Sequence, residues 1–434
     1  MTPARRLAAR CLIDVDGGAY SNLALKSRAA NAELARRDLL FATALFYGTL
    51  ERRITLDYIL DQHLKQGVAK LDPEVRAVLR SGLYQCLFMD GVPARAAVDE
   101  SVKLCRALKK SSAASLVNAV LRKAAAFDLA ALDAIPGDTR RRSVRYALCP
   151  GLVELFCAQY GDRAESLMAA LFGRPAAALR VNSLKTTPEE LAASLAAEEV
   201  ETAPGPLPGS LLVKGGDYLA SEARARGECR VQSLAAQAAA LALDAAPGLS
   251  VLDLCAAPGG KALTAAQQMR NRGRILALDK YDSRLELLRA QAAAEDVSIV
   301  ETIEADAATF DTEERFDRVL CDVPCSGYGE IAAKPELRAK APDGGNPLFA
   351  LQAAILENGA RLTKPGGRLV YATCTLDRRE NEDRAARFLR EHAAFRPAAA
   401  AIRCPGAASS GGQLKFVPCA EDSEGFFIAT FERM

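Results

Sequence analysis

The stretch that decides the fold class lies in the second half of the chain and reads Val251-Leu252-Asp253-Leu254-Cys255-Ala256-Ala257-Pro258-Gly259-Gly260-Lys261. Its opening residues predict a short buried strand, small residues then form a turn, and a helix is expected to begin near Lys261. Doubly wound α/β domains hold nucleotide-like ligands in this way, because small residues let the backbone approach the ligand and the helix N-terminus offers N–H groups. The stretch matches neither G-x-G-x-x-G nor the phosphate loop G-x-x-x-x-G-K-S/T. An ordinary strand-to-helix turn is the alternative interpretation.

The composition is that of a globular protein with several domains. A chain of 434 residues is too long for one hydrophobic core, and 50% hydrophobic with 25% charged residues is a globular composition. No apolar run approaches the ~20 residues of a membrane helix, and the N-terminus lacks a signal-peptide core, so we expect a cytoplasmic protein. The 12 cysteines include no C-x-x-C pair, and only two histidines are present. We therefore expect no metal site, mostly buried reduced cysteines, and one or two cysteine nucleophiles.

The net charge of +2 conceals an asymmetry along the chain. Residues 1–150 carry 24 Lys and Arg against 15 Asp and Glu, whereas the remainder carries 32 against 39. A basic N-terminal part indicates a polyanionic partner bound by the first domain. Solvated basic helices are the alternative, and charge alone does not exclude them.

The pattern divides the chain into three expected domains, 1–140, 141–230 and 231–434. The first reads as an all-α bundle, because apolar residues recur at helical spacing and Asp72-Pro73 marks a helix start. The second reads as a small α+β domain, in which a strand-like run at 178–185 precedes a capped helix start.

Strands and helices alternate in the third domain, which predicts a Rossmann-like α/β fold with a mostly parallel sheet. We expect strands at 250–254, 274–279, 297–303, 316–322 and 368–374, and a terminal strand at 425–431. Residues 404–413 contain Pro, Gly and Ser clusters and are expected to form a mobile loop.

Two aspartates follow successive predicted strands. Asp279 closes the second strand, where a carboxylate accepts hydrogen bonds from a ribose diol, and Asp306 follows the third, where an acid can receive an adenine amino group. A helix N-cap explains either aspartate alone. Both together, at one edge of one sheet, favour an adenosine-containing ligand.

Two cysteines follow the ends of the next strands. Cys325 lies in Asp322-Val323-Pro324-Cys325-Ser326-Gly327, and Cys374 lies in Tyr371-Ala372-Thr373-Cys374-Thr375. Both are expected to face the crevice of the adenosine ligand, and a cysteine thiolate is a strong nucleophile. Two buried small hydrophobic residues are the alternative, since cysteine is often buried.

The N-terminal sequence resembles the NusB-type RNA-binding helical domain in "RRDLLFATALFYGTLERRITLDYIL" and "SLVNAVLRK", among other stretches. The words "DLCAAPGGK", "DVPCSGYGEI" and "YATCTL" resemble, in order, motifs of RNA (cytosine-5)-methyltransferases of the Sun/NOL/NOP group. In the bacterial members that act on small-subunit (16S) rRNA, a NusB-like domain precedes the catalytic domain.

The resemblance implies an S-adenosylmethionine-dependent methyltransferase whose partner is small-subunit rRNA. It implies that Cys374 adds to C6 of cytosine and activates C5, that Asp322 hydrogen-bonds N3 and the amino group, and that Cys325 assists release. The target base must leave any stack to react. The interpretation takes the chain as a monomer without a membrane or metal partner, although no pattern fixes the oligomeric state.

The resemblance also implies where the methyl donor lies. It would extend along residues 255–261, with Asp279 on the ribose and Asp306 on the adenine. Lys261 would touch the carboxylate of the donor or the RNA. After "DVPCSG" the chain reads Ile331-Ala332-Ala333-Lys334-Pro335-Glu336 and lacks the basic pair of the family.

Several alternatives stay open at this stage. The substrate could be tRNA or another RNA, Cys325 could be the nucleophile, or the protein could be an RNA-binding assembly factor with a vestigial methyltransferase domain. Arg180, Asn182 and Lys185 either contact RNA or form a polar strand face. The run Arg140–Arg142 either faces phosphates or is a solvated helix face.

Overall fold

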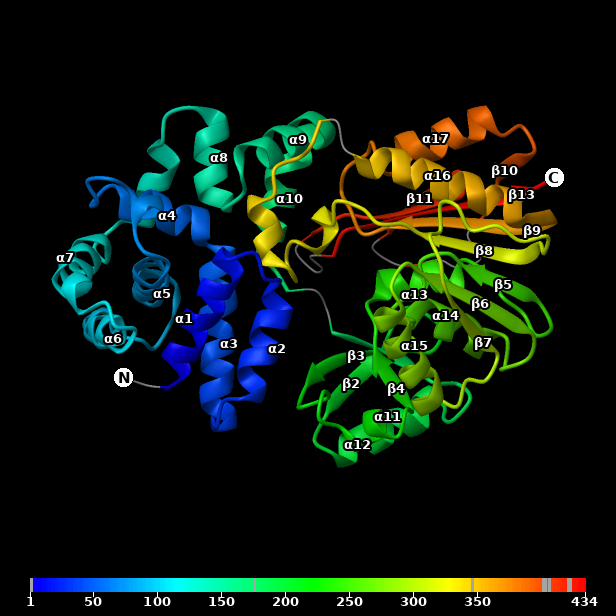
Figure 1. Cartoon of the computed structure of the whole chain (residues 1–434), viewed down its shortest axis with the longest axis horizontal. Helices are drawn as coiled ribbons and strands as arrows, with labels where there is room; N and C mark the ends of the chain where they lie inside the picture. Colours follow the sequence, from blue (N-terminus) through cyan, green and yellow to red (C-terminus); the bar gives the residue numbers. More distant parts are fainter. Residues whose placement is uncertain (1–2, 175–176, 345–346, 400–403, 405–406, 420–423) are drawn as a thin grey trace. The chain divides into compact units, whose positions relative to one another are not determined.

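The computed structural model describes residues 3–174, 177–344, 347–399, 404, 407–419 and 424–434 (Figure 1). The chain forms two compact units. The helical unit comprises residues 1–172 and 331–342, and the sheet unit comprises residues 173–330 and 343–434. The expected fold class is confirmed, whereas the three domain boundaries stay a prediction.

The apolar faces of helices α1 to α7 meet in one core of the helical unit. Helix α5 begins at Pro73, as Asp72-Pro73 predicted, because proline in the first turn loses no helical hydrogen bond. The helices are α1 (Pro3–Asp16), α2 (Ser21–Ala30), α3 (Arg36–Glu51), α4 (Arg53–Asp61), α5 (Pro73–Phe88), α6 (Ala94–Ala107), α7 (Ala114–Ala124), α8 (Asp138–Tyr146), α9 (Pro150–Tyr160) and α10 (Ala164–Ala170). No helix among the described residues is both long and apolar enough to cross a membrane.

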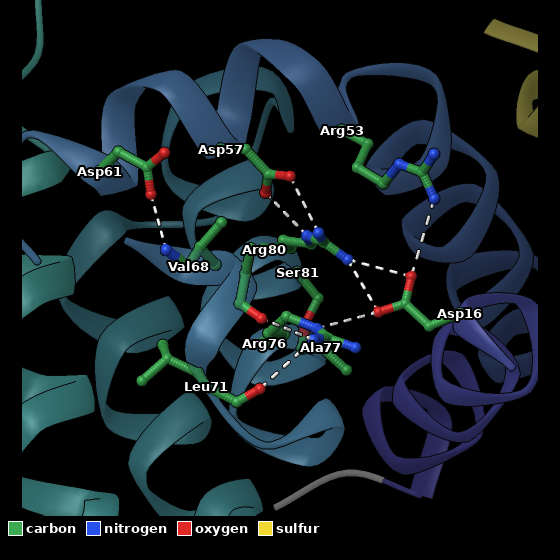
Figure 2. Close-up of polar contacts among 11 residues, drawn as sticks. Asp16, Arg53, Asp57, Asp61, Val68, Leu71, Arg76, Ala77, Arg80 and Ser81 are labelled. Carbon is green, nitrogen blue, oxygen red and sulfur yellow. Dashed lines mark hydrogen bonds and ion pairs between the residues drawn. The ribbon is translucent and has the colours of Figure 1, made fainter. Parts of the chain in front are cut away.

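A cluster of charged side chains joins α1, α4 and α5 (Figure 2). Arg80 of α5 donates from Nε and Nη2 to the two carboxylate oxygens of Asp57 of α4, at 2.7 and 2.8 Å. Its Nη1 pairs with Asp16 of α1 at 2.9 Å, and Asp16 also pairs with Arg76 at 3.2 Å. Arg80 is 9% exposed, so its charge requires these carboxylates as compensation.

Residues 331–342 belong to the helical unit, although they lie within the sequence of the α/β domain. Arg338 holds this segment in place, because its Nη1 donates to the carbonyl oxygen of Tyr146 at 2.9 Å and its Nη2 to that of Leu171 at 2.5 Å. The guanidinium carbon lies 4.4 Å from the ring centroid of Phe172, and the side chain is 2% exposed. The chain therefore leaves the sheet unit after Glu330 and returns to it at Asp343.

The smaller sheet of the sheet unit has the order β2-β3-β1-β4, with every neighbouring pair antiparallel. Its elements are β1 (Ala178–Val181), α11 (Pro188–Ala197), β2 (Glu201–Pro204), β3 (Ser210–Gly215), α12 (Glu222–Ala225) and β4 (Cys229–Val231). Thr187 caps α11 in a capping box with Glu190, which confirms the predicted helix start.

The larger sheet has nine strands among the described residues, in the order β11-β12-β13-β9-β8-β5-β6-β7, with β10 paired to β13. The run from β9 to β7 is parallel, and β13 is antiparallel to β9. The strands are β5 (Ser250–Asp253), β6 (Arg274–Asp279), β7 (Val300–Glu304), β8 (Phe316–Asp322), β9 (Thr363–Thr373), β10 (Phe395–Pro397), β11 (Ala407–Ser410), β12 (Gln413–Phe416) and β13 (Phe426–Arg433). The bounds of β6 and β8 match the prediction, whereas β7 begins three residues later than expected.

Helices cover both faces of this sheet (Figure 1). Val251 and Ile275 pack in one core with α13 (Leu234–Leu241) and α14 (Gly260–Gln268). Their chain neighbours Leu252 and Leu276 pack in another core with α16 (Pro347–Leu362) and α17 (Glu382–Glu391). Helix α15 (Asp282–Ala294) follows β6. This alternation places the strand ends of the sheet between two helical layers.

The prediction of a loop at 404–413 is wrong for residues 407–410, which form a strand. Residues 407–410 form β11 and pair with β12 in antiparallel register, from Ala407 opposite Phe416 to Ser410 opposite Gln413. The positive φ angles of Gly411 and Gly412 make the tight turn between the two strands. Glycine and serine therefore mark a hairpin here. Residues 405–406 lie outside the described residues.

We expect Arg80→Ala to lower the free energy of unfolding by about 2–3 kcal/mol, because Asp16 and Asp57 would lose their cation. The value lies below that of a fully buried pair, because the Asp57 side chain is 26% exposed. Calorimetric unfolding of the full chain measures the change. Lys103→Ala is the matched control, because Lys103 pairs with Glu100 at the surface and should change stability by less than about 1 kcal/mol. An Arg80→Ala protein as stable as this control would contradict the structural role of the cluster.

Candidate active site

The predicted site residues gather where parallel strands end at one edge of the larger sheet. β5 ends at Asp253, β6 ends at Asp279, and β8 ends at Asp322. β8 and β9 are parallel neighbours with Asp322 opposite Ala372, so Cys374 follows two residues beyond that pair. The carboxyl edge of a parallel sheet is where ligands bind in such folds.

The thiols of Cys325 and Cys374 lie together. Their Sγ atoms are 3.3 Å apart, and either can donate a hydrogen bond to the other. The contact with Cys325, burial, and the negative charges of Glu330 and Asp322 raise the pKa of Cys374 well above its usual value. In the resting protein this thiol is therefore protonated at neutral pH.

Backbone contacts fix the loop after β8 against the end of β9. The N–H of Gly329 donates to the carbonyl oxygen of Cys374 at 3.0 Å. The hydroxyls of Ser326 and Thr375 hydrogen-bond at 2.6 Å. A Cβ atom at position 329 would overlap the carbonyl of Gly425 and lie 2.9 Å from that of Cys374, so the approach requires glycine.

The structure adds Glu330 to the cysteine pair. Cys374 Sγ donates to Glu330 Oε2 at 3.4 Å. Glu330 ends the short 3₁₀ turn Tyr328–Glu330 and is partly buried. Glu330 could not be predicted from the sequence, because a glutamate after a glycine-rich turn carries no signal of its own.

Lys261 and Asp322 form an ion pair beside the cysteines, with Nζ 2.7 Å from Oδ2. Burial alone would lower the pKa of Lys261, but Asp322 and Asp253 raise it overall, so the ammonium is charged at neutral pH. Its Nζ also lies 5.6 Å from the ring centroid of Phe426. Lys261 was expected to contact the methyl donor or RNA, and here it orients Asp322.

The turn at 255–261 has the features of a ligand cradle. Gly259 has φ +111°, and a Cβ atom there would lie 2.7 Å from Leu288 Cγ. Helix α14 begins at Gly260, next to the turn. Asp253 Oδ2 is buried and has no hydrogen-bond partner among the described residues. Burial and the neighbouring Asp322 raise the pKa of Asp253 to about 7.

The two aspartates expected at an adenosine have different surroundings. Asp279 is 3% exposed, accepts the N–H of Tyr281 at 3.1 Å and pairs with Arg284 at 2.8 Å. Asp306 is partly exposed, accepts the N–H of Ala308 at 3.0 Å and pairs with Lys280 at 3.1 Å. The N–H of Ala308 and the charge of Lys280 lower the pKa of Asp306. Both stay candidate ligands of a nucleoside, and among the described residues no cluster of His, Cys, Asp and Glu could hold a metal ion.

Arg180 and Asn182 are not placed to contact RNA, so that alternative is wrong for them. Arg180 is 4% exposed and donates to the carbonyl oxygen of Pro208 at 2.5 Å. Asn182 is fully buried and donates to the carbonyl oxygens of Gly227 and Glu295, both at 2.9 Å. The small sheet is linked to segments far away in sequence by Arg180, which donates to Gln267 at 3.3 Å, and by the contact of Asn182 with Glu295.

The other basic candidates also have partners within the chain. Lys185 Nζ donates to two backbone carbonyls and pairs with Asp296 at 3.0 Å. In α8, Arg142 pairs with Glu165 at 2.7 Å and Arg141 with Asp138 at 2.7 Å. These ion pairs are surface contacts of helix α8, which supports the solvated-face interpretation of this run.

Three family models match successive parts of the chain. The 16S rRNA methyltransferase RsmB/F model matches residues 240–432, the NusB family model matches 2–126, and the RsmF/B-like ferredoxin-like domain model matches 152–216. These matches confirm the resemblance of the N-terminal part to the NusB domain and of the C-terminal part to the RNA methyltransferases.

Similar proteins span the whole chain. The "Probable ribosomal RNA small subunit methyltransferase B" of Bacillus subtilis is 35% identical and covers 100% of this chain and 99% of its own length. The ribosomal RNA small subunit methyltransferase B of Thermus thermophilus is 32% identical and covers 99% of this chain and 98% of its own.

Solved structures have the same fold. The crystal structure of PH0851 superposes with a TM-score of 0.84 at 27% identity and covers 100% of this chain and 99% of its own. NSun6 from Pyrococcus horikoshii shares the fold over 65% of this chain and 97% of its own, with a TM-score of 0.59 at 20% identity. On these full-length similarities, the chain belongs to the ribosomal RNA small subunit methyltransferase B family.

Proposed function

We propose that this protein transfers a methyl group from S-adenosylmethionine to C5 of a cytosine in small-subunit rRNA, through a covalent bond between Cys374 and C6. One observation carries the proposal: the thiols of Cys325 and Cys374 lie 3.3 Å apart at the ends of neighbouring strands. Relatives named as small-subunit rRNA methyltransferases, similar over the full chain, support the choice of substrate.

The reaction requires an enzyme nucleophile, because C5 of cytosine is not nucleophilic enough to take a methyl group unaided. When the Cys374 sulfur adds to C6, the π electrons of the ring move toward C5, which then behaves as an enamine carbon. Negative charge develops at the N3 edge of the ring. Asp322, oriented by Lys261, is assigned as the acid at that edge: in its protonated form it donates its proton toward N3, and its other oxygen accepts a hydrogen bond from the exocyclic amino group.

Residues of the sheet edge fit the methyl donor. The unpartnered buried oxygen of Asp253 suits an ammonium group, the turn at 255–261 leaves room for close approach, and Asp279 suits a ribose diol. Asp306 is assigned to the adenine. S-adenosylmethionine, when bound, supplies the electrophilic methyl group for C5.

Release requires that the C5 proton leave and that the bond between Cys374 and C6 break. Cys325 is assigned to assist this step, because its Sγ is adjacent to that of Cys374. The two cysteines therefore have different tasks, and their variants should fail at different stages.

We expect Cys325→Ala to accumulate a covalent complex with unmodified small-subunit rRNA and S-adenosylmethionine, because addition proceeds and release is slow. Cys374→Ala should neither form this complex nor make 5-methylcytosine. Denaturing gels measure the complex, and nucleoside mass spectrometry measures the product.

The outcomes of this comparison are distinct. The reverse pattern would make Cys325 the nucleophile. Methyl transfer by wild type to tRNA and not to rRNA would keep the chemistry and overturn the substrate. Failure of wild type on every RNA would favour an assembly factor with a vestigial enzyme domain.

We expect Asp279→Asn to weaken S-adenosylmethionine binding by roughly 10-fold or more, since a hydrogen bond to a charged group contributes about 1.5–3 kcal/mol. Asparagine keeps an acceptor for the N–H of Tyr281, so the fold should persist. Titration calorimetry of the donor measures the affinity. Asp282→Asn, at the exposed start of α15, is the control, and equal affinities of the two variants would contradict the ribose assignment.

A further inference from the structure

The carboxylate of Glu330 lies against the candidate nucleophile Cys374, and the proposed methyl transfer assigns it no role. Cys374 Sγ donates a hydrogen bond to Glu330 Oε2 at 3.4 Å. The distance is within the range for a sulfur donor, so the thiol of Cys374 can direct its proton to this oxygen. Geometry of this kind is the first requirement for a base that takes this proton.

The backbone holds Glu330 in this place. The N–H of Gly329 donates to the carbonyl oxygen of Cys374 at 3.0 Å, and the N–H of Gly425 donates to the carbonyl oxygen of Gly329 at 2.9 Å. Gly329 is thus hydrogen-bonded to Cys374, which follows β9, and to Gly425, which precedes β13. The N–H of Glu330 itself donates to Gly327 at 2.9 Å, so the turn fixes the carboxylate beside the sulfur.

The thiol needs a proton acceptor because the resting protein favours the protonated form. Cys325 on the loop after β8, Glu330 on the 3₁₀ turn and Asp322 at the end of β8 all surround Cys374 and raise its pKa, and burial adds to this. Lys261 of α14 also interacts electrostatically with Cys374, and its ammonium forms an ion pair with Asp322 at 2.7 Å. Two other neighbours are less suited to accept the proton of Cys374. One oxygen of Asp322 is already paired with Lys261, and Cys325 is itself a thiol.

We propose that Glu330 is the base that takes the proton of the Cys374 thiol as its sulfur adds to C6 of the target cytosine. This inference rests on the proposed function. The S–H bond breaks and the proton moves to Glu330 Oε2, while the sulfur electron pair forms the S–C6 bond. The electrons of the C5=C6 bond move to C5 and the N3 edge. C5 then takes the methyl group of the donor. In release the C5 proton leaves with the assistance assigned to Cys325, and the C5–H electron pair re-forms the C5=C6 bond. The S–C6 pair returns to sulfur, which takes its proton back from Glu330.

The test uses the full-length protein, S-adenosylmethionine and small-subunit rRNA transcribed with 5-fluorocytidine. Fluorine at C5 replaces the proton that release must remove, so the covalent complex accumulates and its rate of formation reports the addition. We expect Glu330→Gln to form the complex at least about 100-fold more slowly than wild type at pH 7.5. Its rate should rise about tenfold per pH unit as solvent removes the thiol proton, whereas the wild-type rate should rise less steeply.

A second readout separates a catalytic from a merely structural effect. Glutamine removes a negative charge that raises the pKa of Cys374, so iodoacetamide should label Cys374 of the resting variant faster than that of wild type. In a variant whose affinity for S-adenosylmethionine is unchanged, slower addition to RNA together with faster alkylation is the result expected if Glu330 takes the proton. Glu357→Gln is the matched control, because Glu357 is 67% exposed and pairs with His392.

The opposite results are equally clear. A Glu330→Gln rate of complex formation equal to or above the wild-type rate would overturn the inference. If Glu330→Gln does not fold, Glu330→Asp provides the test. Its carboxylate is moved back by one methylene, so complex formation should slow at least about tenfold while donor affinity stays unchanged. An unchanged rate of complex formation would overturn the proposal. If wild type itself forms neither complex nor 5-methylcytosine, the proposed function fails, and the inference fails with it.

Discussion

The parallel pairing of β8 with β9 is the constraint on which the candidate site depends. Its register sets Asp322 opposite Ala372. Both strands therefore end at the same edge of the sheet, and the loops that follow them meet. A slip of one residue would turn every side chain of a strand to the other face and would separate Cys374 from Cys325. The two helical layers over this sheet hold the register, because alternate strand residues are buried in two different cores.

The charged groups at this edge of the sheet affect Lys261 and Cys374 differently. One cation, Lys261, lies among the carboxylates of Asp253 and Asp322, and the thiol of Cys374 faces Cys325 and Glu330. Cys325, burial and the negative charges of Glu330 and Asp322 raise the pKa of Cys374, so the resting protein holds this sulfur as a thiol. The segment that follows Glu330 belongs to the helical unit and is held there by Arg338, which was evident only from the structure.

Much of the fold and the outline of the site could be predicted from sequence, because both depend on local patterns. β6 and β8 are apolar runs that end in aspartate, and their bounds follow from that pattern. The rest depends on contacts between distant segments. Arg180 and Asn182 look like a polar strand face, but they are buried against residues far along the chain. Glu330 meets Cys374 only because two glycines permit a close backbone approach, and Gly411-Gly412 makes a hairpin where a loop was expected.

The most direct test of the central claim is to identify the sulfur that carries the RNA. The wild-type protein would be trapped on 5-fluorocytidine-containing small-subunit rRNA, digested with nuclease and protease, and the nucleotide-bearing peptide identified by mass spectrometry. The account predicts a methylated fluorocytidine attached to Cys374, in the peptide that contains Tyr371-Ala372-Thr373-Cys374-Thr375. A nucleotide attached to Cys325, or a trapped complex without any cysteine adduct, would contradict it.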